Sequence, residues 1–183
     1  MGGLRAFNIV NTSVINVTTK NCKFADNYGS AVRHVLAGLK SAYNSSFGGC
    51  VSWMFNATGN TTLMMSESVY QNCRAGSGGA IDIMFKDIVG TGPSGASAST
   101  FIQNCHFVNS TALQQSGGAV QMQFSSSLYD DQNVTSSEAF YTDITGTSFE
   151  GGLAHTRGGC IELLSEQLRS TTSVHVNIHN SNF

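Results

Sequence analysis

The sequence predicts an all-β chain in which short parallel strands stack into a solenoid. Two short motifs alternate along all 183 residues, and self-similarity of this kind is the signature of a repeat architecture. The segments that follow one of these motifs alternate apolar and polar residues, which is the pattern of a strand. No stretch keeps a 3.6-residue period over three turns, so the sequence predicts no helix.

The first motif joins two glycines to a small residue and an aliphatic one. Its copies are Gly48-Gly49-Cys50-Val51, Gly78-Gly79-Ala80-Ile81, Gly117-Gly118-Ala119-Val120 and Gly158-Gly159-Cys160-Ile161, with Gly29-Ser30-Ala31-Val32 as a degenerate first copy. Paired glycines suit a sharp bend in which φ is positive or a neighbouring segment leaves no room for a Cβ. The third positions lie 19, 30, 39 and 41 residues apart, an irregular interval that a propeller or an array of helical hairpins would not tolerate.

Each Gly-Gly motif leads into a strand. One face of these strands carries Val51, Trp53 and Phe55, then Ile81, Ile83 and Phe85, then Val120, Met122 and Phe124, and finally Ile161 and Leu163. Because parallel neighbours lie about 4.8 Å apart, we expect Phe55, Phe85 and Phe124 to stack as a ladder inside the molecule. The opposite row, made of Ser52, Asp82, Gln121 and Glu162, is expected to face outward.

The second motif is Asn-Cys/Ser-x-Phe, and it begins at Asn21, Asn44, Asn104 and Asn180, with weaker copies at Asn72 and Gly146. We expect Asn21, Asn72, Asn104 and Asn180 to form one ladder at a corner, where stacked amides bond to one another and to the backbone of the bend. Residues 173–179 alternate as well, with Val174, Val176 and Ile178 on one face, and predict a further strand.

Residues 1–183 are expected to form a single segment of about five coils, each centred on one pair of motifs. Insertions near residues 86–100 and 125–140 are expected to leave the stack at the same corner, where protruding loops could carry binding. Neither end shows a pattern that would cap it. We therefore expect this segment to belong to a longer solenoid, or to stack end to end with copies of itself or with related subunits.

The composition points to an extracellular chain. Only 11% of the residues are charged, against about 25% in typical soluble domains, and a net charge of -2 offers nucleic acid no basic surface. No apolar run approaches the roughly 20 residues that span a bilayer. Seven Asn-x-Ser/Thr sequons predict N-glycosylation in the secretory pathway of a eukaryote. The candidate acceptors are Asn11, Asn16, Asn44, Asn56, Asn60, Asn109 and Asn133.

Five cysteines occupy two motif positions. Cys22, Cys73 and Cys105 follow an Asn, whereas Cys50 and Cys160 follow a Gly-Gly pair. Neighbouring rungs lie within disulfide reach, so Cys73 could pair with Cys105, and Cys50 could instead pair with Cys22 or Cys73. The thiols could also pack unpaired in a ladder. No Cys or His spacing indicates zinc, and we expect neither a metal nor a cofactor.

The motifs resemble those of a known class of surface protein. Phe24-Ala25-Asp26-Asn27 before Gly29-Ser30-Ala31-Val32, together with the later Gly-Gly-Ala-Ile and Gly-Gly-Ala-Val copies, resemble the FxxN and GGA(I/L/V) repeats of the chlamydial polymorphic membrane proteins. They are also similar to NCxF and GGAI repeats in large surface proteins of protists and algae. The resemblance implies a right-handed parallel β-helix of the pectin-lyase-like type in an extracellular or cell-surface setting. Most Phe motifs lack the second Asn, and the sequons favour the eukaryotic proteins.

We therefore expect a non-catalytic structural or adhesive glycoprotein segment in a larger cell-surface or filamentous assembly, with glycans or cell-wall polysaccharide as candidate ligands. The alternative is a polysaccharide lyase or hydrolase, which needs clustered carboxylates on an outer face. Asp82 and Glu162 occupy equivalent positions, but Gln121 separates them. His175 and His179 would lie about 13 Å apart along one strand, too far to share a metal without further ligands.

Overall fold

The computed structural model describes residues 5–6, 14–27, 32–36, 49–56, 60–86, 96–114, 117–125, 138–166, 168 and 172–183. In these ranges every regular element is a strand, and no helix occurs among them. The strands form four sheets, and every strand pairing is parallel. The prediction of an all-β chain with parallel strands is therefore confirmed.

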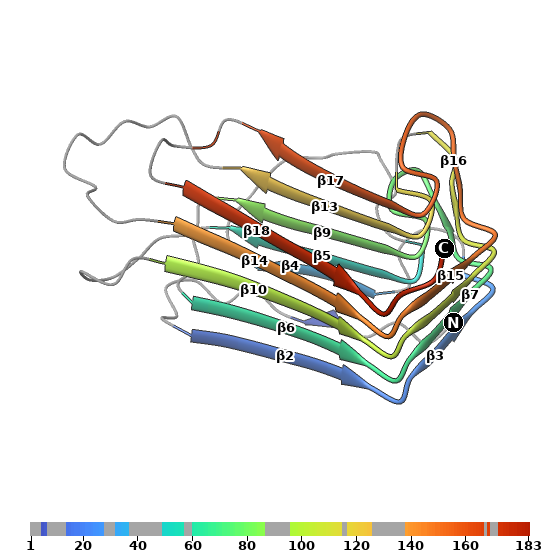
Figure 1. Cartoon of the computed structure of the whole chain (residues 1–183), viewed down its shortest axis with the longest axis horizontal. Coiled ribbons are helices and arrows are strands. Elements are labelled where there is room, and N and C mark those ends of the chain that lie inside the picture. The colour runs from blue at the N-terminus through green and yellow to red at the C-terminus, as the bar shows by residue number, and fades with distance from the viewer. Residues whose placement is uncertain are drawn as a thin grey trace.

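Two of the sheets are large, and their strands run in opposite directions in Figure 1. The six-stranded sheet contains, in spatial order, β1 (Arg5–Ala6), β4 (Val32–Leu36), β5 (Val51–Asn56), β9 (Ile81–Lys86), β13 (Val120–Ser125) and β17 (Ile161–Glu166). The five-stranded sheet contains β2 (Val14–Lys20), β6 (Asn60–Ser66), β10 (Ala96–Gln103), β14 (Glu138–Thr145) and β18 (Thr172–His179).

Two smaller sheets connect the ends of the large ones. The four-stranded sheet contains β3 (Lys23–Ala25), β7 (Val69–Gln71), β11 (His106–Val108) and β15 (Ser148–Glu150). The three-stranded sheet contains β8 (Arg74–Ala75), β12 (Thr111–Ala112) and β16 (Leu153–Ala154). From β5 onward the chain visits the six-, five-, four- and three-stranded sheets in turn and then starts again. We call each such circuit a rung.

The irregular motif spacing has a simple explanation in this topology. β4 and β5 are neighbours in the six-stranded sheet with no described strand between them, so only 19 residues separate their Gly-Gly motifs. The two expected insertions fall between β9 and β10 and between β13 and β14, which are equivalent connections. β10 already begins at Ala96 and β14 at Glu138, so both insertions end before the expected boundaries. Residues 87–95 and 126–137 lie outside the described residues.

Aromatic rings form two columns in the interior. The register places Phe55 beside Phe85 and Phe85 beside Phe124, with ring centroids 5.0 and 6.0 Å apart. A second column runs along the four-stranded sheet, with neighbouring centroids 4.7 to 5.2 Å apart and planes within 8° of parallel. Its members are Phe24, Tyr70, Phe107, Phe149 and Phe183. Parallel pairing repeats each ring at the strand spacing, and the column is buried at Tyr70, Phe107 and Phe149, half-buried at Phe24 and exposed at Phe183.

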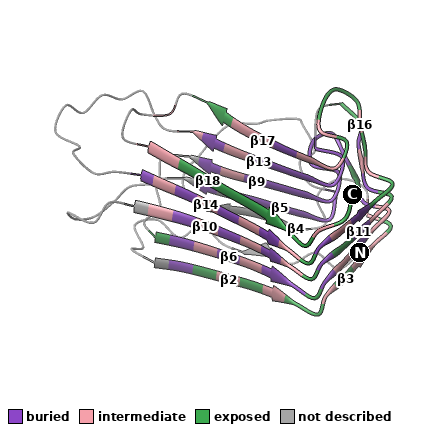
Figure 2. Ribbon diagram, viewed as in Figure 1, coloured by how far each residue is buried: buried purple, intermediate pink, exposed green. Residues whose placement is uncertain are grey.

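The core lies between the two large sheets. Phe140 of β14 packs against both Phe85 and Phe124 of the opposite sheet, with centroids 6.1 and 5.0 Å apart. Figure 2 shows β9 and β13 buried along most of their length and β14 with alternating buried residues, whereas β18 at one end of its sheet is largely exposed. Burial therefore decreases at the last rung.

The expected single asparagine ladder is wrong, because the four residues occupy two corners. At the corner between the five- and four-stranded sheets, positive φ angles recur at Asn21, Glu67, Asn104, Gly146 and Asn180. At the corner between the four- and three-stranded sheets they recur at Asp26, Asn72, Asn109 and Gly151. Asn72 therefore belongs to the second column, where its Nδ2 donates to Asp26 Oδ1 at 2.7 Å. Both corners require the left-handed conformation, which Asn, Asp and Gly adopt most readily.

The residue after each bend at the first corner stabilises the backbone. This residue is a thiol or hydroxyl in every rung, and its side chain donates to the carbonyl two residues earlier. The column consists of Cys22, Ser68, Cys105, Thr147 and Ser181. Ser68 and Thr147 also accept the N–H of Cys22 and Cys105 from the adjacent rung. Hydroxyls and thiols, more than stacked amides, therefore satisfy the corner backbone between rungs.

Candidate functional site

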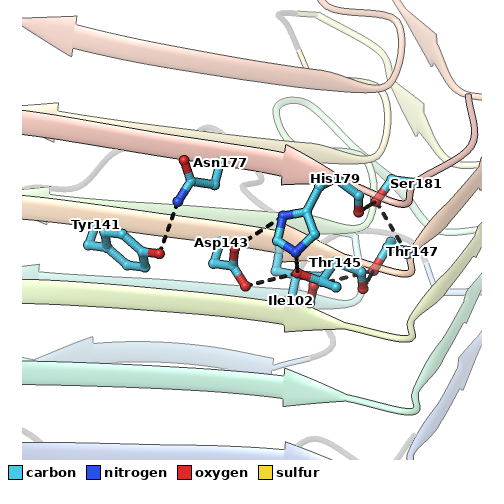
Figure 3. Close-up of polar contacts among 8 residues, drawn as sticks. All are labelled: Ile102, Tyr141, Asp143, Thr145, Thr147, Asn177, His179 and Ser181. Carbon is cyan, nitrogen blue, oxygen red and sulfur yellow. Dashed lines mark hydrogen bonds and ion pairs between the residues drawn. The ribbon is translucent and has the colours of Figure 1, made fainter.

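A polar cluster lies on the outward face of β14 and β18 (Figure 3). Strand alternation turns Phe140, Thr142 and Ile144 toward the core, so the alternate residues of β14 face outward. Those residues are Tyr141, Asp143 and Thr145, and parallel pairing sets them beside His175, Asn177 and His179 respectively. The cluster therefore follows from two alternating strands in direct register.

Three side chains at the carboxyl end of these strands contact one another. Thr145 Oγ1 donates to Asp143 Oδ2 at 2.9 Å and lies 3.0 Å from Nε2 of His179. His179 Nδ1 is 3.6 Å from Asp143 Oδ1, a distance that becomes an ion pair when the imidazole is protonated. The Asp143 side chain is only 13% exposed, whereas that of His179 is 52% exposed. The imidazole thus partly covers a carboxylate that is held in place from two sides.

The cluster has the residue types of a nucleophile, a base and an acid, but not their geometry. The single hydroxyl proton of Thr145 is directed to Asp143, so the threonine accepts from the Nε2 proton of His179 and does not deliver its own proton to the imidazole. The nearby N–H of Gly146 is already bonded to the carbonyl of His179 at 3.3 Å, so it does not serve as an oxyanion donor. This arrangement suits binding better than acyl transfer.

Two aromatic rings extend the polar cluster across the sheet. Phe101 of β10 and Tyr141 of β14 lie 5.9 Å apart, and both are half-buried. Asn177 Nδ2 donates to the Tyr141 hydroxyl at 3.0 Å and holds that ring in place. A face that combines fixed rings with amide, carboxylate and imidazole groups can bind a ligand with one apolar and one polar side, as a sugar ring has. We call Phe101, Tyr141, Asp143, Asn177 and His179 the outward patch.

The row expected to face outward on the six-stranded sheet is instead buried. Ser52, Asp82, Gln121 and Glu162 are no more than 9% exposed, which corrects the sequence-based expectation. Gln121 Nε2 donates to Glu162 Oε2 at 3.0 Å, and Ser77 hydrogen-bonds to Gln121 Oε1. The row thus forms a layer of polar side chains inside the molecule.

The Gly-Gly bends explain this burial. Gly78, Gly117 and Gly158 have φ angles of 54°, 69° and 60°, and each bend folds back over the strand that it introduces. A Cβ on each of these glycines would lie 2.8 to 3.0 Å from the Cβ of Asp82, Gln121 or Glu162 in turn. The glycines are therefore needed both for the backbone conformation and for the close cover of the row.

Asp82 is the most perturbed acid of this row. Burial alone raises the pKa of its carboxyl to about 8, because the charged form loses its hydration. No hydrogen bond or ion pair to this carboxyl occurs among the described residues. A carboxyl that is neutral and covered is a poor partner for a polysaccharide, so the structure does not support Asp82 and Glu162 as an exposed catalytic pair.

Three of the seven sequon asparagines have described side chains, and all three are exposed. Asn16 lies on the outward face of the edge strand β2. Asn60 opens β6, and its Oδ1 accepts the backbone N–H of Ser97 at 3.1 Å, which leaves Nδ2 toward solvent for a glycan. Asn109 lies in the left-handed bend of the second corner. Asn56 belongs to β5, but its side chain is outside the described residues, as are Asn11, Asn44 and Asn133.

One disulfide joins Cys50 to Cys73, with Cα atoms 5.6 Å apart. This is one of the pairings that the sequence left open, and it rules out the bond between Cys73 and Cys105. Cys22, Cys105 and Cys160 are free. Ser68 occupies the rung between Cys22 and Cys105, so those two thiols are too far apart to bond. Burial raises the pKa of the Cys105 thiol, so this thiol is poorly reactive.

Within the described ranges no group of three or more His, Cys, Asp or Glu side chains could hold a metal ion. The same residues include no helix long and apolar enough to cross a bilayer. Comparison with protein-family models finds no match, and comparison with curated proteins and with solved structures finds none either. The function must therefore be inferred from the molecule itself.

Proposed function

We propose that the chain is a segment of a right-handed parallel β-helix in an extracellular, N-glycosylated protein with a structural or adhesive role. The chain visits four parallel sheets in a fixed order, which supports a β-helix. The right hand is proposed because parallel crossovers are nearly always right-handed. One observation carries the functional part. The inward residues Val174, Val176 and Ile178 of β18 are 36 to 42% exposed, whereas their counterparts in β6, β10 and β14 are buried, and a further strand on this edge, from the same chain or from another, would cover them.

The setting is supported by two chemical features. Exposed Asn16, Asn60 and Asn109 are in position to accept glycans, and the Cys50–Cys73 bond belongs to an oxidising compartment. Glycans would also hydrate a surface that has few charges. Localisation outside the cell or at its surface is part of this proposal.

Expression of the full chain in a eukaryotic secretory host, followed by intact-mass and glycopeptide analysis, tests the setting. We expect glycan on Asn16 and Asn60, loss of one glycan mass in each of Asn16→Gln and Asn60→Gln, and an oxidised Cys50–Cys73 pair. Secreted protein that carries no glycan, or in which all five cysteines react with a thiol reagent, would contradict the proposal.

Adhesion would use the outward patch, with a polysaccharide as the candidate ligand. Binding to neutral and acidic polysaccharide columns should weaken in Tyr141→Ala and Asp143→Asn, whereas Thr18→Ala, on the same face at the far edge of the sheet, serves as the matched control. Turnover of a polysaccharide that disappears in Asp143→Asn would instead favour the alternative, a lyase or hydrolase. The buried position of Asp82 and Glu162 gives that alternative no support.

A further inference from the structure

The outward face of the five-stranded sheet concentrates its negative charge at one point. Among the described residues of its strands, Asp143 is the only acid that faces outward. The other acid of these strands, Glu138, is 2% exposed and belongs to the buried side. Parallel pairing sets Asp143 between Phe101 of β10 and Asn177 of β18.

One oxygen of the Asp143 carboxylate is open to a ligand. Thr145 donates to Oδ2 at 2.9 Å, whereas no described residue donates a hydrogen bond to Oδ1, and His179 Nδ1 lies 3.6 Å from it (Figure 3). The side chain is only 13% exposed. A carboxylate that has lost much of its hydration pairs more strongly with a cation than one in bulk water does.

Two aromatic rings adjoin this carboxylate. Phe101 is its direct partner in register, and Tyr141 lies two residues earlier on the same face of β14. The two ring centroids are 5.9 Å apart and the rings are inclined by 50°, while Asn177 holds the Tyr141 hydroxyl at 3.0 Å. An ammonium group is attracted to the face of an aromatic ring as well as to a carboxylate. Ring and carboxylate together therefore suit a ligand amine.

The charges around the patch favour the same kind of ligand. Lys20 is the only Lys or Arg in the strands of this sheet, and it already pairs with Glu67 at 3.2 Å. It belongs to β2, three strand spacings from β14, which is roughly 14 Å and beyond the screening length of about 8 Å at physiological salt. The described face thus offers a carboxylate and no unpaired Lys or Arg, so its charge complements a cation.

The rest of the face suits an extended chain that carries many hydroxyl groups. Thr62, Ser99 and Tyr141 form one register row across the strands, and Gln103 lies beside Thr145 in another. These side chains are partly exposed, and their hydroxyl and amide groups can bond to sugar hydroxyls. A single lysine of a protein ligand would use only the rings and the carboxylate, whereas a polysaccharide would also use these rows.

We infer that the outward patch binds a polysaccharide with free amino groups, whose ammonium lies between the Asp143 carboxylate and the Phe101 ring. The inference rests on the proposed adhesive function and names the ligand class of the same site. The carboxylate also favours the protonated form of the bound amine. N-acetylation of the sugar removes this charge and leaves the hydroxyl groups in place.

Isothermal titration calorimetry of the full chain at neutral pH tests the inference with two probes of equal length, an oligomer of glucosamine and its fully N-acetylated form. The glucosamine oligomer should bind at least about tenfold more tightly. In Asp143→Asn, which keeps an acceptor for Thr145, the two oligomers should bind about equally. Phe101→Leu should weaken binding of the glucosamine oligomer more than that of the acetylated one. Glu150→Gln removes an exposed carboxyl from β15 and, as the matched charge control, should keep the full preference.

The outcomes separate this inference from the proposed adhesive function. Equal or tighter binding of the acetylated oligomer, a preference that survives in Asp143→Asn, or a preference that Glu150→Gln reduces as much overturns the inference. Each of these results leaves polysaccharide binding by the outward patch standing, provided that Tyr141→Ala weakens it. If neither oligomer binds, the inference fails, and the polysaccharide columns then decide whether the adhesive function fails with it.

Discussion

Replacing Asp82 by Asn should stabilise the protein near neutral pH. Asp82 is buried at the centre of the polar row, and its pKa is raised from 3.8 to about 8 by the loss of hydration. Below pH 3.8 the folded and unfolded chains both carry the proton. Between pH 3.8 and 8 only the folded chain retains it, so the free energy of unfolding falls as the pH rises.

The size of the effect follows from the width of this window. Each pH unit within it removes about 1.4 kcal/mol, so at pH 7 the carboxyl costs up to about 4 kcal/mol relative to a side chain that cannot ionise. Relaxation and water entry around the carboxylate reduce this value, which is therefore an upper bound. Asn has the same shape and no charge, so Asp82→Asn should remove the cost.

Urea unfolding of both proteins at several values between pH 4.5 and 8.5 measures this difference. The stability gained by Asp82→Asn should grow with pH by up to about 1.4 kcal/mol per unit and should fall to about 1 kcal/mol at pH 4.5. Contributions from the other carboxylates are common to both proteins and cancel. Glu150→Gln, which removes a carboxyl from the exposed end of β15, should keep the pH dependence of the unmodified chain. If Asp82→Asn is less stable at pH 8, or if its gain does not change with pH, then the carboxyl is ionised and stabilised in the fold, and the reasoning fails.

Three further predictions concern the stacking itself. The Cys50→Ala/Cys73→Ala double variant should lose about 3 kcal/mol in urea unfolding, because the disulfide closes a loop with a sequence separation of 23. If reductant destabilises this variant as much as the unmodified chain, the disulfide is not the source of that stability. Ala80 and Ser110 occupy the positions of Cys50 and Cys73 one rung further on, so the Ala80→Cys/Ser110→Cys pair should form a second disulfide, which mass spectrometry would detect as the loss of two hydrogens. Gly118→Ala should cost about 3 kcal/mol, because its Cβ would overlap the carbonyl of Gly159. Gly159→Ala should change stability little, because no neighbouring atom lies closer than 3.6 Å to its Cβ. Equal urea midpoints for the two variants would refute this account of the glycine pairs.

The strands and their faces could be predicted because strand alternation is local. Ile81, Ile83 and Phe85 face the core as the two-residue period requires, and the repeated phase after each Gly-Gly pair places Phe55 beside Phe85. The second aromatic column was within reach of the same reasoning. Its signal was the Phe at the end of each Asn motif, together with Tyr70, which occupies the same phase in a rung where the motif is degenerate.

The asparagine motif misled the sequence interpretation for a physical reason. Cys22 and Cys73 each follow an Asn with a φ angle of 53°, and each sulfur lies close to the carbonyl oxygen two residues earlier, at 3.4 Å from that of Lys20 and 3.7 Å from that of Gln71. The two bends are therefore locally the same, although they lie at different corners. Only the pairing of whole strands distinguishes them. Likewise, the outward patch joins β14 to β18, which are distant in sequence. The sequence indicated His179 but not its contact with Asp143, because that contact depends on the register of the two strands.

The sequence by itself determined that the chain is all-β, where its strands begin, which residues of each strand share a face, and where the backbone needs glycine. These properties depend on two-residue alternation and on the local conformations that Gly and Asn allow. The tertiary structure decided what covers each face. The Gly-Gly bends bury Asp82 on the side expected to meet solvent, Cys50 lies against Cys73, and Phe140 of one large sheet packs against Phe85 and Phe124 of the other. Each of these facts depends on how one rung packs against another, and no local pattern contains that information.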